Sequence, residues 1–170
     1  MGAEAVERLA GRAGVALRAE RGTNAKMALA RFSSGCALLA VPETYMNESG
    51  LAARPLLRRA GCEEELGRLV VVHDELDLPV GTLRVKRGGG TAGHNGLRSL
   101  QAHLHSLEFV RVRIGVGKPP GRMAGADYVL ARPSGAERDE LDVSEEEAAD
   151  AIETILAEGV DAAMRRFNGR

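Results

Sequence analysis

The chain contains 170 residues, of which 44% are hydrophobic and 28% are charged, and its formal net charge is −1. This composition supports one hydrophobic core and the length is short for two ordinary domains, so we expect a single domain over residues 1–170. No run of about 18 apolar residues and no signal-peptide pattern is present, so we expect a cytoplasmic protein that does not enter a membrane.

The N-terminal half predicts a helix, a β-hairpin and a second helix. Apolar residues recur at helical spacing over the first dozen residues. Residues 27–32 and 36–41 are short β-prone runs, and Ser33, Ser34 and Gly35 between them are typical turn residues. Residues 47–61 show a helical pattern, in which Pro55 is expected to start or kink the second half.

The C-terminal half predicts alternating strands and helices. Residues 69–73 form a continuous apolar run, which indicates a buried strand that ends at Asp74. Residues 82–86 and 109–116 alternate like strands, and residues 95–105 suit a helix. Two helices are expected in the tail, one with Ser144 as its N-cap and Glu147 three residues later, the other over residues 160–167.

Charge is distributed unevenly along the chain. Residues 81–122 contain eight Lys or Arg and one acid, whereas residues 137–153 contain nine acids and one Arg. A basic middle segment suits a phosphate-bearing substrate, because neutralised phosphates release counterions. A solvated face balanced by an acidic helix explains the same pattern equally well.

Asp74 and Asn95 are the first candidates for chemistry and Asn47 is a further one, and each has a structural alternative. A carboxylate at a strand end can accept the ring N–H of a histidine and stabilise its protonated form, but Asp74 and Asp77 can also simply cap turns. Asn47 precedes a predicted helix and either caps it or offers its amide to a substrate carbonyl. Asn95 has the same two interpretations, and the glycines around it indicate close backbone approach by another group.

Other motifs are weaker. Residues 88–93 satisfy the GxGxxG pattern after a strand and before a helix, so a dinucleotide-binding protein is an alternative. No acidic ribose ligand follows about 20 residues later, which counts against it. The four histidines show no metal-ligand spacing, and we expect no metal or cofactor. Cys36 and Cys62 are expected to be buried thiols rather than a disulfide or zinc site.

Four motifs in the same order resemble bacterial peptidyl-tRNA hydrolase, over nearly the whole chain. They are residues 41–50, 73–79, 93–96 and 111–117. The resemblance implies an α/β fold, with a single domain built on a twisted mixed β-sheet flanked by helices. It also implies hydrolysis of the ester between a peptide and tRNA, which recycles tRNA from aborted translation, by a monomer without an obligate protein partner.

By the same resemblance, Asp74 matches the carboxylate that orients the catalytic histidine. Tyr45, Asn47 and Asn95 match residues that contact the acceptor end and the peptide, and Lys86 and Arg113 match a pair that clamps the tRNA phosphate.

The start of the chain departs from the family pattern. Members open with a strand and a segment that carries the general-base histidine, and Gly2 matches the last glycine of that segment. We therefore expect an N-terminally truncated domain that lacks the first strand and the base. A positioned base typically supplies about 10²–10⁴ in rate, so impaired catalysis is expected. A non-catalytic RNA-binding relative with the same fold is the alternative.

Overall fold

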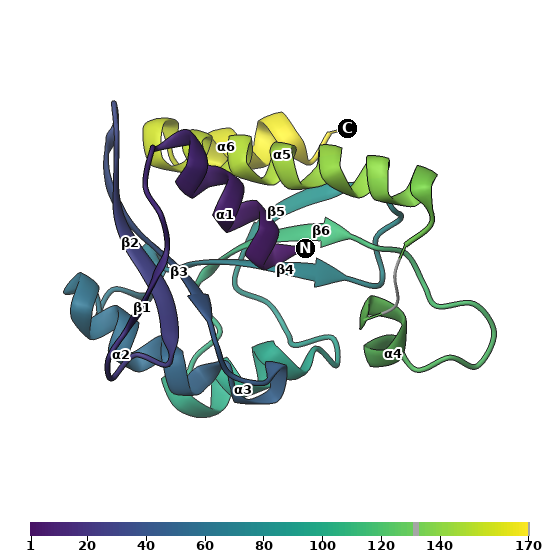
Figure 1. Ribbon diagram of the computed structural model, residues 1–170, viewed down its shortest axis with the longest axis horizontal. Coiled ribbons are helices and arrows are strands. Elements are labelled where there is room, and N and C mark those ends of the chain that lie inside the picture. The colour runs from purple at the N-terminus through teal and green to yellow at the C-terminus, as the bar shows by residue number, and fades with distance from the viewer. Residues whose placement is uncertain (131–132, 170) are drawn as a thin grey trace. The chain divides into compact units, whose positions relative to one another are not determined.

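The computed structural model describes residues 1–130 and 133–169, and its α/β architecture is drawn in Figure 1. The helices are α1 (Gly2–Arg12), α2 (Gly50–Ala60), α3 (Asn95–Leu104), α4 (Gly125–Leu130), α5 (Gly135–Glu158) and α6 (Val160–Phe167), with short 3-10 helices η1 (Met46–Glu48) and η2 (Leu66–Arg68). The strands are β1 (Arg18–Glu20), β2 (Ala25–Phe32), β3 (Gly35–Pro42), β4 (Val70–Glu75), β5 (Leu83–Arg87) and β6 (Val110–Gly115).

The chain groups into two compact units. Unit 1 comprises residues 1–8, 72–86 and 111–170, and unit 2 comprises residues 9–71 and 87–110. The expected single domain stays a prediction. Among the described residues, no helix combines the length and the apolar character that crossing a membrane requires.

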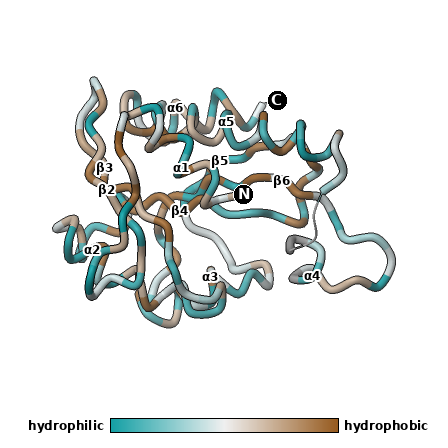
Figure 2. The backbone as a smooth tube through the Cα atoms, viewed as in Figure 1, coloured by the Kyte–Doolittle hydropathy of each residue, from teal (hydrophilic) through white to brown (hydrophobic). Residues whose placement is uncertain are grey.

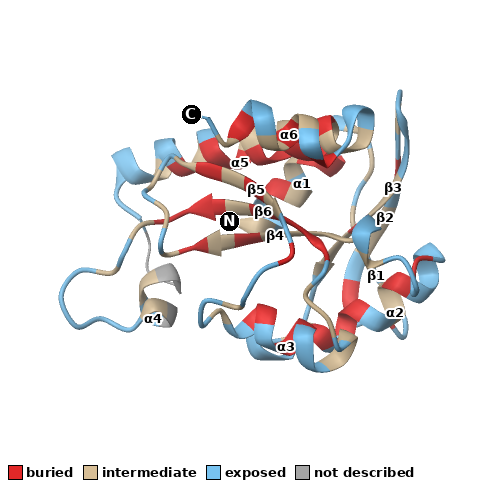
Figure 3. Cartoon of the chain, turned by 180° about the vertical axis from the view of Figure 1, so that it is seen from behind, coloured by how far each residue is buried: buried red, intermediate tan, exposed pale blue. Residues whose placement is uncertain are grey.

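Unit 2 contains an antiparallel sheet in the order β1-β2-β3. Phe32 pairs with Gly35, so Ser33 and Ser34 form the two-residue turn of the predicted hairpin. The short strand β1 was not predicted. Cys36 is exposed and pairs with Arg31 next to the turn, so the prediction of a buried thiol was wrong for Cys36, although Cys62 is buried. The tip of the β2–β3 hairpin is coloured as exposed in Figure 3.

Helices α2 and α3 pack closely in unit 2. A Cβ atom built on Gly50 would lie 2.3 Å from the Ser99 carbonyl oxygen, so only glycine permits this approach. Apolar side chains then form a small core beside it, namely Ala53, Leu97, Leu100 and Phe109. Pro55 lies inside α2, which continues on both sides of it, so it does not start a separate helix.

The second sheet has the order β4-β6-β5 and is mixed. Bonds from Val110 N to Leu69 O and from Val116 N to Glu75 O show that β4 and β6 are parallel. Bonds from Gly88 N to Phe109 O and from Gly115 N to Thr82 O show that β5 is antiparallel to β6. Mixed pairing is therefore confirmed, but the strands are divided between two sheets rather than one.

Burial within this sheet depends on strand position. The apolar residues 70–72 of β4 are only half-buried, because β4 lies at an edge of the sheet, so the prediction of a fully buried strand was wrong there. The central β6 is buried on both faces, including Arg111 at 2% exposure. Hydrophobic stretches of both strands are visible in Figure 2. At the other edge, the Asn168 side chain pairs with both backbone groups of Val85 in β5.

Helix α5 explains the acidic segment of unit 1. Ser134 accepts from Glu137 N and the Glu137 carboxylate accepts from Ser134 N, so the capping box starts the helix ten residues before the predicted N-cap. Ser144 lies inside α5 and donates to Glu140 O, which corrects that prediction. Arg8 of α1 and Arg138 both bind the fully buried Glu145, so part of the acidic run is neutralised locally.

Candidate functional site

A cationic face covers the second sheet within unit 1. The antiparallel register places Lys86 opposite Arg111 and Arg84 opposite Arg113, and residues directly opposite share one face. Like charges opposite each other repel, so this arrangement needs a compensating anion from the protein or from a ligand. Four of the eight basic residues in the middle segment thus share one face of this sheet, and one of the four, Arg111, is buried.

Glu75 provides the compensating charge for Arg113. Its Oε2 accepts from Arg113 Nε at 3.1 Å and from Arg113 Nη2 at 3.0 Å, and its Oε1 accepts from Asp77 N at 3.3 Å. Burial by itself raises the pKa of the Glu75 carboxyl. The hydrogen bonds from Arg113 and Asp77 and the charges of Arg113 and His73 lower it by more, so the pKa lies below its ordinary value. Sequence reasoning missed Glu75, because nothing in its motif distinguishes it from the neighbouring acids.

Lys86 lies in the electrostatic field of the same cluster. Burial lowers the pKa of its ammonium, and the charges of Arg113 and Arg111 lower it further, whereas Glu75 opposes them. A lysine that is destabilised by its own neighbours gains more from a phosphate than an isolated lysine does. The structure thus groups Lys86 and Arg113, the two residues predicted as a clamp, on one face; their role stays a prediction.

Asp74 lies inside β4 and is half-buried. Neighbouring residues in a strand point to opposite faces, so the Asp74 side chain lies on the face opposite Glu75. Its backbone carbonyl is bonded to the Nδ1 of buried His73 at 2.8 Å. Asp77 follows the strand, is exposed and pairs with Lys118 Nζ at 3.8 Å.

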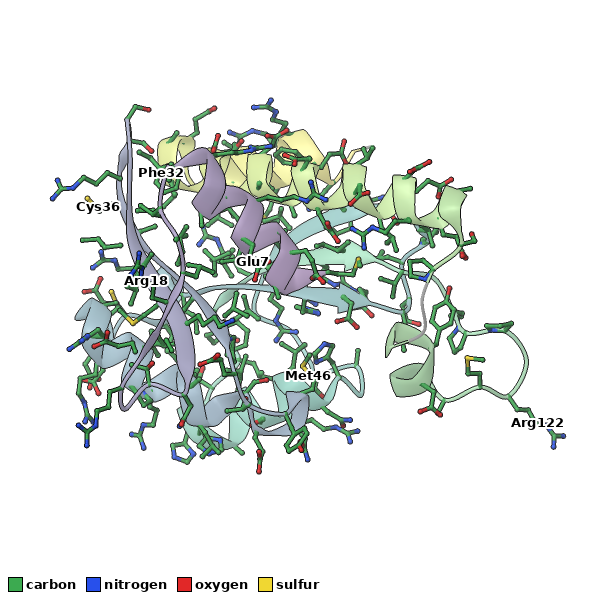
Figure 4. The ribbon with its side chains drawn as sticks, in the orientation of Figure 1. Glu7, Arg18, Phe32, Cys36, Met46 and Arg122 are labelled. Carbon is green, nitrogen blue, oxygen red and sulfur yellow. The ribbon has the colours of Figure 1, made fainter. Side chains whose placement is uncertain are left out.

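Tyr45 and Asn47 lie in unit 2 at the start of η1, and both are exposed, Tyr45 at 81%. Met46 between them packs on α3, since a Cβ built on Gly96 would lie 2.7 Å from the Met46 sulfur; Figure 4 labels Met46 in this segment. Asn47 does not cap α2, because Gly50 N donates to Ser99 Oγ at 2.9 Å instead. Its amide makes no hydrogen bond within the described part of the chain.

Asn95 is the first residue of α3 and is exposed. The N-cap of this helix is His94, whose Nδ1 accepts from Gly96 N at 3.1 Å and from Leu97 N at 3.3 Å. The capping alternative is therefore excluded for Asn95 as it is for Asn47. A neutral His94 ring that accepts at Nδ1 carries its proton on Nε2, so it cannot serve as a base without losing the cap.

The two other chemistries are not supported by geometry. Strands β5 and β6, which precede and follow α3 in the chain, are antiparallel neighbours. The dinucleotide-binding unit instead joins two parallel strands through its helix. The Glu108 carboxylate also lies against Gly88, where it would repel a pyrophosphate. Within residues 1–130 and 133–169, no group of three or more His, Cys, Asp or Glu side chains is arranged to hold a metal ion.

The family described as Peptidyl-tRNA hydrolase matches the chain over residues 1–170. The chain belongs to the peptidyl-tRNA hydrolase family. A peptidyl-tRNA hydrolase of Cutibacterium acnes (strain DSM 16379 / KPA171202) is 46% identical over 180 residues, which covers 99% of this chain and 88% of that protein. That of Rhodococcus jostii (strain RHA1) is 44% identical over 160 residues, covering 94% and 83%.

Solved structures of the peptidyl-tRNA hydrolase family confirm the α/β fold class. The crystal structure of peptidyl-tRNA hydrolase from Acinetobacter baumannii at 1.00 Å resolution has a TM-score of 0.88 and 30% sequence identity, covering 96% of this chain and 82% of that one. The family match extends from the first residue to the last, so it does not support the expectation that a strand and a histidine segment are missing.

Proposed function

We propose that the chain hydrolyses the ester bond between a peptide and the 3′ ribose of tRNA. The full-length family match carries this proposal, and 46% identity to a peptidyl-tRNA hydrolase supports it. The reaction requires a base that takes a proton from water, donors that stabilise the oxyanion formed at the acyl carbon, and a departing ribose oxygen that regains the proton. No metal or cofactor is part of the proposal.

Unit 1 is proposed to supply Asp74, Lys86 and Arg113. Asp74, on the opposite face of β4 from Glu75, would accept the ring N–H of the general base and stabilise its protonated form. Lys86 and Arg113 would bind a tRNA phosphate, because they lie on the same face of the sheet and the charge of Arg113 acts on Lys86. Such contacts position the nucleic acid without reading its sequence.

Unit 2 is proposed to supply Tyr45, Asn47 and Asn95. The exposed amides of both asparagines are not used as helix caps, so they are available to hold the acyl group and its developing oxyanion. The exposed ring of Tyr45 offers a surface on which the acceptor end can stack. A monomeric cytoplasmic protein with a single domain, acting in tRNA recycling, completes the proposal.

None of the four histidines matches the family's base by motif position, and His94 is already used as a cap. We therefore propose that this chain hydrolyses the ester slowly. Its rate is about 10²–10⁴-fold lower than that of a protein with a positioned base. This observation also favours the second candidate, a non-catalytic RNA-binding protein. The two candidates differ in whether any ester is cleaved.

The test compares release of an N-acetylated amino acid from tRNA by this chain and by the Cutibacterium acnes relative. The chain should be slow, and added imidazole should accelerate it, because a free base then occupies the position beside Asp74. Asp74→Asn should abolish this acceleration, whereas Asp77→Asn, which removes an exposed carboxylate nearby, should preserve it. A rate equal to that of the relative, lost in His94→Ala, would assign the base to His94 and contradict the proposal. Binding of tRNA without cleavage, even with imidazole, would favour the second candidate.

A further inference from the structure

Unit 2 contains a basic hollow that none of the motifs includes. Its volume is about 450 Å³, and it lies between the turn after β1 and the C-terminal half of α2. It is lined by Arg21, Gly22, Thr23, Pro55, Arg58 and Arg59. Arg54 lies one helical turn before Arg58 on the same exposed side of α2. We call Arg21, Arg54, Arg58 and Arg59 the α2 cationic surface.

The four arginines divide into two pairs by their contacts. Arg58 Nε binds Glu63 Oε1 at 3.2 Å, and Arg59 binds Glu20 at the end of β1, which fixes α2 to the strand. Arg21 and Arg54 are exposed, and neither forms an ion pair with any described residue. The surface therefore keeps a positive excess after its internal pairs are counted, although the whole chain has a net charge of −1.

The exposed side of α2 changes character along its length. Leu51, Arg54 and Arg58 are spaced so that they lie on one face of the helix, and all three are exposed. Exposed Tyr45 and Met46 precede the helix, at 81% and 56% exposure. Nitrogen-tipped side chains extend into solvent around α2 in Figure 4. The helix has 11 residues and is therefore about 16 Å long, so an aromatic and apolar surface leads to a cationic one over a distance of a few nucleotides.

This combination matches the way proteins bind single-stranded or end regions of nucleic acids, with bases on aromatic faces and phosphates on arginines. We propose that the α2 cationic surface binds backbone phosphates of the tRNA, in addition to the Lys86 and Arg113 pair of unit 1. The inference rests on the proposed function, because it takes tRNA as the occupant. Arg21 and Arg54 make the new contacts, while Arg58 and Arg59 hold the hollow in shape.

The experiment measures the dissociation constant for deacylated tRNA over a series of salt concentrations. Each phosphate contact contributes about 0.7–0.9 to the slope of log K against log salt. The double variant Arg21→Gln/Arg54→Gln should therefore reduce this slope by about 1.5 and weaken binding at low salt. The control is Arg31→Gln/Arg68→Gln, which removes the same charge from exposed positions of unit 2 outside the surface, and it should leave the slope within about 0.3 of the unsubstituted chain.

Two results would overturn the inference: an unchanged slope in Arg21→Gln/Arg54→Gln, or an equal loss in both double variants, which would indicate a dependence on net charge alone. Urea unfolding of each variant verifies that these exposed substitutions leave the fold intact. If the unsubstituted chain fails to bind tRNA at all, the proposed function fails together with this inference. If the unsubstituted chain binds tRNA and Arg21→Gln/Arg54→Gln binds it in the same way, this inference fails and the proposed function does not.

Discussion

Arg113 donates two hydrogen bonds to a single oxygen of Glu75, so this carboxylate offsets part of the repulsion that Arg113 meets from the cations of the neighbouring strand. Both side chains are largely shielded from solvent, with 9% of Glu75 and 21% of Arg113 exposed. The pair therefore holds the guanidinium in one orientation beside Lys86. A residue that contacts no substrate in the proposed mechanism thus sets the geometry of the predicted phosphate clamp.

Replacing Glu75 by glutamine should destabilise the fold by about 1.5–3 kcal/mol at pH 7, the range for hydrogen bonds to charged groups. The folded-state pKa of Glu75 lies below its ordinary value, so its contribution is complete above the ordinary glutamate pKa of about 4.3. The contribution is lost as the pH falls through the folded-state pKa. Urea unfolding of both proteins between pH 7 and pH 3 should show the difference shrink.

The control for Glu75→Gln is Asp77→Asn, which makes the same charge change at an exposed residue paired only loosely with Lys118. It should change stability by no more than about 0.5 kcal/mol. If Glu75→Gln and Asp77→Asn lower stability equally, Glu75 has no special role in holding Arg113.

Removing the Lys86 ammonium should weaken tRNA binding and reduce its salt slope by about 1, since one phosphate contact is lost. A tRNA with a 5′-phosphate and one with a 5′-hydroxyl should bind the unsubstituted chain differently and bind Lys86→Ala alike. Lys118→Ala removes a lysine that is 77% exposed and should retain the discrimination. Equal discrimination by Lys86→Ala and the unsubstituted chain would show that the terminal phosphate binds elsewhere.

His94 has a structural role that its motif did not indicate, because its Nδ1 caps α3. His94→Ala should lower stability by about 0.5–2 kcal/mol, as the loss of an N-cap typically does. His94→Asn supplies another side-chain acceptor and should recover most of this loss. Thermal unfolding of both variants gives the comparison, and a His94→Asn protein as unstable as His94→Ala would exclude capping as the reason for the histidine.

Local patterns predicted the elements whose signals lie within a few residues. The hairpin follows from two β-prone runs around Ser33 and Ser34, and α3 from helical spacing after the glycine loop. The start of α5 was misplaced because Ser134 with Glu137 and Ser144 with Glu147 have the same capping pattern. The structure uses the first pattern as the cap, and Ser144 lies inside the helix that Ser134 begins.

Contacts between distant residues could not be predicted in the same way. Ser99 satisfies the backbone of Gly50 across 49 residues, and Glu75 pairs with Arg113 across 38. Neither pair has a sequence pattern, since any hydroxyl or carboxylate would look the same until the helices and strands are packed. Asp74, Asn47 and Asn95 were candidates because of their places at a strand end and beside helices, whereas Tyr45, Lys86 and Arg113 came only from resemblance to the family. The structure shows that neither asparagine caps a helix.

Asn168 closes the open edge of β5, and its removal gives the most direct test of how unit 1 satisfies a sheet edge. Its Oδ1 accepts from Val85 N at 2.7 Å, and its Nδ2 donates to Val85 O at 2.8 Å. Val85 is fully buried, so Asn168→Ala leaves a buried donor and acceptor unpaired, at about 1–3 kcal/mol for each. Asn47→Ala removes an exposed amide without a described hydrogen bond and should change stability by less than about 0.5 kcal/mol. Urea unfolding that gives the two alanine variants the same stability would show that water replaces Asn168 at this edge.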